Sequence, residues 1–202
     1  EGFFRSQDLP AAVYLSPACT PNDLPERLSA QGFLQQPESE TWMVLENLVD
    51  FELPPAHRDV TVRPVSAANT ETFAEVFLTS FGLPAQFAPI MVDLLGPSVE
   101  LAGTQHYLAY AQDQPIGTCS LLRHEHYGVL GSTGVLSEHR RGGAATNLAI
   151  RALKDARAHG IETVMLQTAA GTWLERLLRI SGFKPVFARK CYVRDDDCSG
   201  QD

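Results

Sequence analysis

Hydrophobic and polar positions change period repeatedly along this chain, and each change predicts a new element. Apolar runs and period-two alternation predict strands at residues 10–17, 41–48, 59–66, 105–111, 115–124 and 127–136. Helical spacing predicts helices at residues 21–32, 68–82 and 86–96. From residue 143 onward the two patterns alternate, as helix 143–159, strand 161–168, helix 171–181 and strand 183–193. This order predicts an α/β (α+β) fold, with a mixed, mostly antiparallel sheet and helices on both faces.

The helices at residues 68–82 and 143–159 carry the clearest apolar stripes. The first places one face of aromatic and aliphatic residues toward the core: Phe73, Val76, Phe77 and Phe81. The second predicts a buried stripe of small and aliphatic residues: Ala145, Leu148, Ala149, Ala152, Leu153 and Ala156. Its charged residues are expected to face water: Arg151, Lys154, Asp155 and Arg157. Gly160 is expected to end this helix.

An internal similarity indicates how the chain is organised. Residues 13–33 and 164–183 share a strand, a loop, a helix and a terminal Gly-Phe, about 150 residues apart. We therefore predict that residues 1–50 are a degenerate partial copy of the last part of a larger domain at residues 59–194. The alternative is a chance similarity of two amphipathic segments. Residues 51–58 contain two adjacent prolines and are predicted to be a linker, and residues 195–202 to be a tail.

Composition indicates a soluble globular protein, with 44% hydrophobic and 20% charged residues. No long uninterrupted apolar run predicts a membrane span, and no secretory signal is evident, so a cytoplasmic location is expected. Cys19, Cys119, Cys191 and Cys198 lack the spacing of a metal site or a redox motif. Free thiols and no bound metal are therefore expected.

The net charge of −8 is unevenly distributed, because basic residues concentrate in residues 138–190. An acidic chain disfavours nucleic acid, whereas a local basic surface suits a small polyanion. Arg140, Arg141, Gly142 and Gly143 directly precede a helix, whose first backbone N–H groups lack partners within the helix. Together with the helix dipole and the two guanidinium groups, they predict a phosphate receptor. The alternative is a solvated basic face and a plain loop.

The run from Arg140 to Ala145 matches the Q/R-x-x-G-x-G/A motif of the GNAT acetyltransferases (GCN5-related N-acetyltransferases), which this chain resembles over about residues 59–194. The resemblance implies a splayed central strand and an acetyl-CoA site. The site it implies consists of these residues: Gly134, Val135, Leu136, Arg140, Arg141, Gly142, Gly143, Ala144, Ala145, Thr146, Gln167, Gly171 and Leu174. The strand residues would pair with the pantetheine arm, and the backbone amides from Arg140 to Thr146 would hold the pyrophosphate.

Two customary catalytic groups of the family are missing from this chain. Leu178 occupies the position where many members carry a tyrosine acid, and residues 127–136 contain no carboxylate base. Glu125, His126 and Ser132 are the candidate substitutes, although a polar hairpin tip is the favoured explanation of the first two. A metal at the His124-x-His126 pair is disfavoured, because further ligands are not nearby.

The resemblance implies an acetyl-CoA-dependent N-acetyltransferase that transfers the acetyl group to a small-molecule primary amine by direct attack. The alternative is a catalytically degenerate domain that binds acetyl-CoA or another acyl-CoA as a sensor. We expect neither nucleic-acid nor membrane partners, and a monomer or a homodimer.

Overall fold

The computed structural model describes residues 11–194, which form two compact units. One unit, called here the terminal unit, contains residues 11–44 and 167–194; the other, the central unit, is Leu45–Leu166. Both combine strands with helices, and nearly all strand pairs are antiparallel, so the predicted fold class is confirmed. The predicted tail at residues 195–202, with Cys198, lies outside the described residues.

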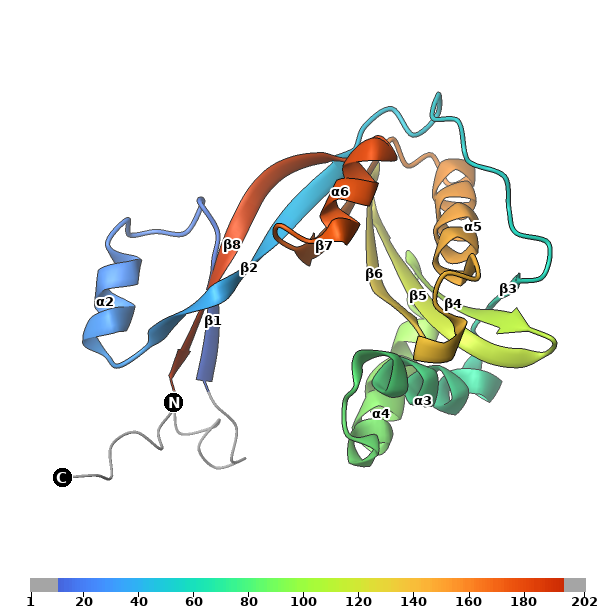
Figure 1. Cartoon of the computed structure of the whole chain (residues 1–202), viewed down its shortest axis with the longest axis horizontal. Coiled ribbons are helices and arrows are strands. Elements are labelled where there is room, and N and C mark those ends of the chain that lie inside the picture. Colours follow the sequence, from blue (N-terminus) through green and yellow to red (C-terminus); the bar gives the residue numbers. More distant parts are fainter. Residues whose placement is uncertain (1–10, 195–202) are drawn as a thin grey trace. The chain divides into compact units, whose positions relative to one another are not determined.

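The central unit contains a meander of antiparallel strands followed by one parallel neighbour (Figure 1). The antiparallel neighbours are β3 (Thr61–Pro64), β4 (Thr104–Ala111), β5 (Gln114–His124) and β6 (Tyr127–Val135). The first residues of β7 (Thr163–Ala169) pair with β6 in parallel. The four strands β4, β5, β6 and β7 begin and end within about two residues of their predicted positions.

Helices cover both faces of the central unit's strands, as predicted (Figure 1). On one face lie α3 (Thr70–Phe81) and α4 (Ala88–Val99), preceded by single 3-10 turns at Ala67–Asn69 and Ala85–Phe87. Phe73 and Val76 of α3 enter a core with Leu108 of β4, and Phe77 is partly buried against it. Phe81 is 50% exposed, so its predicted burial is wrong. It stands at the last residue of α3, directly before the Gly82 C-cap.

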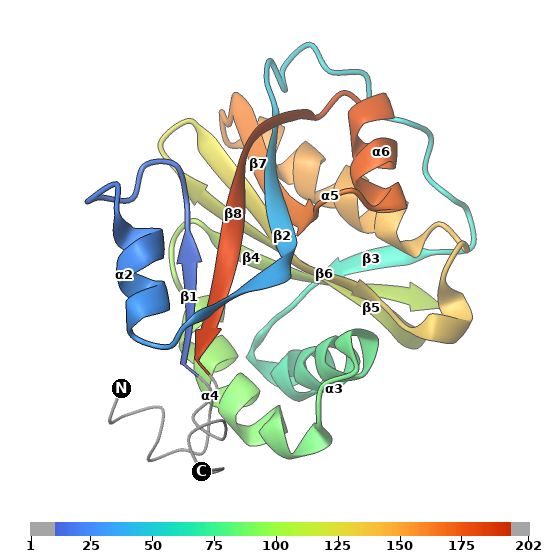
Figure 2. The same cartoon turned by 60° about the vertical axis from the view of Figure 1, so that its left-hand side comes forward.

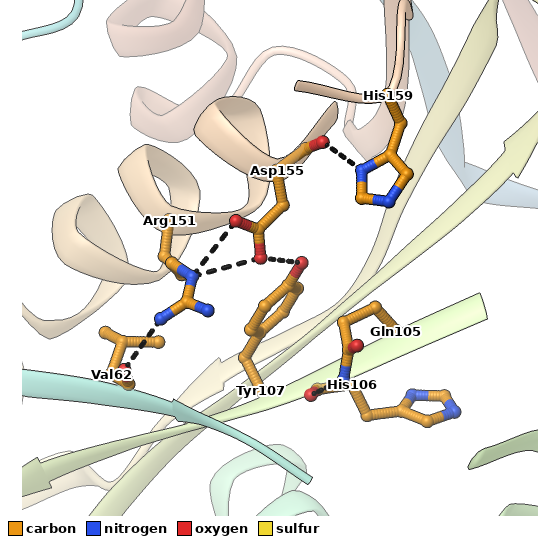
Figure 3. A network of polar contacts seen from close by, with 7 residues as sticks. All are labelled: Val62, Gln105, His106, Tyr107, Arg151, Asp155 and His159. Atoms are coloured by element: carbon orange, nitrogen blue, oxygen red, sulfur yellow. Dashed lines mark hydrogen bonds and ion pairs between the residues drawn. The ribbon is translucent and has the colours of Figure 1, made fainter. Parts of the chain in front are cut away.

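On the other face lies α5 (Ala144–Ala158), whose predicted solvent-facing charges are mostly bonded to protein groups instead (Figure 3). Asp155 accepts a 2.8 Å hydrogen bond from the hydroxyl of the fully buried Tyr107 on β4. Burial and this bond raise the pKa of Tyr107. The Arg151 guanidinium lies 3.0 Å from the same carboxylate. Arg157 donates to the Leu48 and Phe51 carbonyls, and Lys154 alone of the four is exposed as predicted.

The terminal unit is built around β8 (Lys184–Arg194), which pairs antiparallel with both β1 (Ala11–Leu15) and β2 (Leu34–Leu45) (Figure 2). Two helices complete it, α2 (Leu24–Ala30) and α6 (Trp173–Ile180). Strand β2 begins seven residues before its predicted start at residue 41. Its early part is polar and contains Pro37, and a register shift against β8 lies between Gln35 and Ser39. A proline is tolerated there because a bulge does not require its missing N–H.

Both segments of the predicted repeat form a strand, a helix and a second strand. The first is β1–α2–β2 and the second is β7–α6–β8. The compact units divide the chain differently from the predicted segments, because β7 begins in the central unit and ends in the terminal one. That residues 1–50 descend from a partial copy stays a prediction.

A buried histidine ties α4 to the strands of the central unit. The Nδ1 atom of His106 lies 2.7 Å from the Ser120 hydroxyl, and its Nε2 atom lies 2.9 Å from the Ser98 hydroxyl of α4. The Phe73 ring packs against it edge-on at 5.3 Å. Burial lowers the pKa of His106, so the folded protein holds this ring neutral.

This burial predicts an acid-sensitive fold. The unfolded chain binds a proton at His106 below about pH 6.5, whereas the folded chain binds it only at lower pH, so stability is lost as pH falls through the folded pKa. We expect His106→Gln to reduce the fall in the free energy of unfolding between pH 7.5 and 5, measured by urea denaturation. His124→Gln, at an exposed hairpin position, is the control and should keep the wild-type slope. Equal slopes for His106→Gln and the wild type would contradict the assignment.

Candidate coenzyme site

The site begins at a bulge in β6. Gly131 pairs with Ser120 and Gly134 with Thr118, so Ser132 and Thr133 together oppose the single residue Cys119. Ser132 has a φ of 51°, and its carbonyl accepts a 2.8 Å hydrogen bond from the Thr118 hydroxyl. This bond holds the bulge.

Strand β6 extends beyond its last registered pair with β7. The parallel ladder covers four pairs, from Tyr127 with Thr163 to Leu130 with Leu166. Of the five residues that follow in β6, up to Val135, those on either side of the bulge are registered with β5: Gly131, Gly134 and Val135. From the bulge onward, β6 is registered with β5 but has no registered pair with β7 among the described residues. The predicted splay of the central strand falls in this segment.

Gly134 is required by the close approach of α3. A Cβ atom at this position would lie 2.0 Å from the Ser80 hydroxyl oxygen and 2.8 Å from the Phe81 ring. The C-terminal turn of α3 therefore packs directly on the backbone of β6, next to the bulge. The structure shows that the missing side chain of Gly134 makes room for helix packing, and its role at the pantetheine arm stays a prediction.

The loop after β6 has an alternating backbone conformation. A 3-10 turn at Ser137–His139 leads to Arg141 with a φ of 71° and Gly143 with a φ of 85°, whereas Gly142 between them has no positive φ. A left-handed arginine is uncommon and its strain is tolerated mainly at functional sites. Left-handed residues in a turn can direct backbone N–H groups toward one point, as in an anion-binding nest, and we call Arg141–Gly143 the nest. The Gly142 N–H already donates to the His139 carbonyl at 3.3 Å, so the N–H groups of Arg141 and Gly143 are the ones that remain for an anion.

Helix α5 then begins with free donors. Its first helical hydrogen bond runs from the Asn147 N–H to the Gly143 carbonyl, so the N–H groups of Ala144, Ala145 and Thr146 precede it. Gly143 itself is the N-cap residue. These donors and the positive end of the helix dipole fit a phosphate group, as the sequence predicted.

The first turn of α5 is fixed by a buried amide that sequence reasoning missed. Asn147 is 5% exposed, and its side chain accepts from the His57 N–H and donates to the His57 and Val60 carbonyls, all at 2.8 Å. The predicted stripe placed Ala145 inside, but Ala145 is exposed. A hydropathy pattern treats asparagine as a surface residue, so only a search for polar residues within an apolar stripe could have found Asn147.

The two arginines of the loop have different roles. The Arg140 guanidinium donates to the Val135 carbonyl at 3.2 Å and to the Ser80 carbonyl at 3.1 Å, so it connects the end of β6 to α3. Its predicted use as a phosphate-binding side chain is therefore not supported by its contacts. Arg141 is exposed. Glu138 lies in the same loop. Hydrogen bonds from the Glu138 backbone N–H and from the Ser137 hydroxyl lower the pKa of its carboxyl group.

The remaining predicted residues lie in other places. Glu125 and His126 form the two-residue turn between β5 and β6, and the His126 ring is tilted against the Tyr127 ring, with 4.1 Å between the ring centroids. This turn is at the opposite end of the nine-residue β6 from the loop, roughly 26 Å away at 3.3 Å per residue. Ser132 alone of the three catalytic candidates lies at the bulge.

Three further predicted cofactor contacts belong to the terminal unit. The Gln167 side chain accepts from Arg189 at 2.7 Å, and the Gly171 N–H donates to the Glu175 carboxylate at 2.7 Å. Leu174 is 41% exposed. Their roles stay predictions.

The cysteine at the bulge is not a reactive thiol. Cys119 is fully buried, which raises its pKa to about 11, and it accepts a hydrogen bond from the Thr133 hydroxyl. Cys19 and Cys191 are also free thiols. Within residues 11–194 no cluster of His, Cys, Asp and Glu has the arrangement of a metal site, and none of the helices there is long and apolar enough to span a bilayer.

The model of the acetyltransferase (GNAT) family matches residues 72–183, which run from α3 through the bulge and loop to the end of α6. The chain belongs to the GNAT acetyltransferase family. The fold resemblance predicted from the Arg-Gly motif is thus confirmed, and the loop after β6 lies within the matched region. No curated protein sequence matches the chain.

Solved structures share the fold at low sequence identity. A GCN5-related N-acetyltransferase from Sphaerobacter thermophilus has a TM-score of 0.70 and 19% identity over 94% of this chain and 62% of its own. One from Kribbella flavida has a TM-score of 0.68 and 18% identity, over 96% and 71%. A tandem GNAT protein from the clavulanic acid biosynthesis pathway has a TM-score of 0.65 and 16% identity, over 100% and 68%.

The packing at Gly134 predicts a specific loss of stability. In Gly134→Ala the new methyl group meets Ser80 and Phe81, so we expect about 1–3 kcal/mol of destabilisation in urea unfolding. Gly131→Ala, three residues earlier in β6, has no atom within 4 Å of the added Cβ and should change stability much less. Similar losses of stability in both variants would show that the strand conformation, and not packing against α3, requires glycine at position 134.

Proposed function

We propose that this chain is an acetyl-CoA-dependent N-acetyltransferase that acetylates a small-molecule primary amine. One observation carries the proposal: along the chain, the bulged strand β6 is followed by the nest at Arg141–Gly143 and then by open N–H groups at the start of α5. These features lie within the matched family region. Free thiols at Cys19, Cys119 and Cys191 support a reducing compartment, and we place the activity in the cytoplasm, in a monomer or homodimer.

The residues present fit coenzyme A. Backbone N–H groups of Arg141 and of Gly143 to Thr146 would hold the diphosphate, with the exposed Arg141 side chain adding positive charge. The N–H of Val135 remains available for an amide of the pantetheine arm, while its carbonyl already accepts from Arg140. This leaves fewer main-chain acceptors for the arm than the sequence predicted.

Bound acetyl-CoA would supply a thioester. In direct transfer the neutral amine nitrogen would form a bond to the acetyl carbon and release a proton to water, the carbon–sulfur bond would break, and the coenzyme would leave as a thiolate that takes up a proton. Because a thiol has a pKa near 8.5, its thiolate is a tolerable leaving group even without an acid in place of Leu178. The main contribution of this chain would then be positioning, which supports large rate accelerations by itself.

The acceptor must lose its proton before it attacks. A lysine-like amine with a pKa of about 10.4 is roughly 0.1% neutral at pH 7.4, and residues 127–136 of this chain carry no carboxylate base. We therefore propose acceptors with weakly basic amines, such as aromatic amines, which are neutral without help. Ser132 at the bulge is the remaining candidate for ordering a water there.

A sensor function is the second candidate, and the specific observation that favours it is Leu178. This residue occupies the customary acid position, and its carbonyl is used to accept from the Phe183 N–H at the end of α6. A domain that binds acetyl-CoA without turnover would need the loop but not the acid. Binding and turnover experiments separate the two functions.

The nest predicts charge-sensitive binding. Arg141→Glu reverses a charge beside the open N–H groups, so we expect about tenfold or greater loss of acetyl-CoA affinity by calorimetry. Lys154→Glu makes the same change in net charge at an exposed position of α5 and should keep the affinity within about twofold. Equal effects of the two variants would point to overall charge instead of the loop.

Turnover decides between enzyme and sensor. We expect thiol release from acetyl-CoA in the presence of an aromatic amine, followed with a thiol reagent, and slower release with an alkyl amine at pH 7.4. Raising the pH toward 9.5 should narrow this difference, because more of the alkyl amine becomes neutral. Micromolar binding without thiol release from any amine would establish the sensor function.

A further inference from the structure

An exposed histidine from the predicted linker lies on the coenzyme loop. A Cβ atom built on Gly143 would lie 2.2 Å from Cγ, 2.3 Å from Cδ2 and 2.6 Å from Nδ1 of His57. The imidazole therefore covers one side of the Gly143 backbone, and glycine alone leaves room for it. The two residues are 86 positions apart in sequence, and the ring stands at the helix start where the phosphate-binding N–H groups are.

The position of this ring is set by the backbone of its own residue. Asn147 holds both the N–H and the carbonyl of His57 at 2.8 Å, and its amide also reaches the Val60 carbonyl. A buried side chain that binds both polar groups of one residue fixes that residue firmly. The His57 side chain is thus directed to the loop by a dedicated contact, although it is exposed to solvent.

The ring nitrogens of His57 have no hydrogen-bond partner within residues 11–194, in contrast to the Arg140 guanidinium in the loop. Arg140 uses its guanidinium on the Val135 and Ser80 carbonyls. His57 is therefore a side-chain donor that is anchored at the loop and still available to a ligand. An imidazole N–H donates well to a phosphate oxygen, and its protonated form adds a positive charge.

We propose that the His57 imidazole contacts the diphosphate of bound coenzyme A, as a binding residue supplied by the segment before β3. The inference rests on the proposed function, because it assigns one more contact to the same ligand. It also accounts for the two hydrogen bonds between the Asn147 side chain and the backbone of His57, which keep residue 57 beside Gly143. The donor set for the diphosphate then comprises the nest, the first turn of α5 and this imidazole.

The test measures the affinities of coenzyme A and 3′-dephospho-coenzyme A for the wild type, His57→Ala and His159→Ala by calorimetry. Both ligands contain the diphosphate, so His57→Ala should weaken both by a similar factor of about 5 to 20. His57→Gln, which retains an N–H donor, should recover part of the loss. His159→Ala removes an exposed imidazole near the C-terminal end of α5 and should bind both ligands like the wild type.

Three results for His57→Ala would overturn the inference while leaving the proposed function in place. Unchanged affinity in His57→Ala would show that the ring makes no contact, and tighter binding would show that it obstructs the loop. A loss confined to coenzyme A would move the contact to the 3′-phosphate. Wild-type protein that binds neither ligand would instead overturn the proposed function, and the inference with it. Matching thermal midpoints of all variants confirm that the comparison is between folded proteins.

Discussion

The candidate site depends on the buried amide of Asn147. A helix N-terminus binds an anion only if it is held still, because the N–H groups gain by being oriented before the ligand arrives. Asn147 lies in the first turn of α5 and bonds to the main chain at His57 and Val60, so it joins that turn to the segment before β3. Truncation of this side chain would leave three main-chain polar groups without this partner, and the cost for the buried one, the Val60 carbonyl, is about 1–3 kcal/mol.

Two further polar contacts hold α5 and its loop along their length. At the C-terminal half of the helix, the Tyr107 hydroxyl bonds to Asp155, so the helix cannot slide along β4 (Figure 3). At the loop, Arg140 connects the end of β6 to the last turn of α3. The apolar stripe of α5 thus supplies the buried surface. The polar contacts of Asn147, Asp155 and Arg140 set the position of the helix and its loop, as expected when polar contacts specify a unique arrangement.

The sequence was sufficient for the elements and for the loop, because both have local signatures. Period-two alternation and helical spacing placed β4, β5, β6 and α5 within about two residues, and the Arg-Gly run marked the helix start. The polar early part of β2 was missed, since its strand conformation comes from pairing with β8 and not from its own pattern. His57, Asn147 and the Arg140 side chain were also missed as structural contacts. Their partners lie about 60 to 90 residues away, except Val135, and no local period records such contacts.

The two strand–helix–strand segments, β1–α2–β2 and β7–α6–β8, differ in how their helices begin. In the later segment, Thr172 caps α6 by accepting from the Glu175 N–H, and the Glu175 carboxylate in turn binds the Gly171 N–H. In the earlier segment α2 has Asp23 at its N-cap without a side-chain cap, and Pro25 within its first turn. The strands β1 and β2 are nevertheless both paired with β8. The pairing of β1 and β2 with β8 therefore does not depend on a side-chain cap at the start of α2.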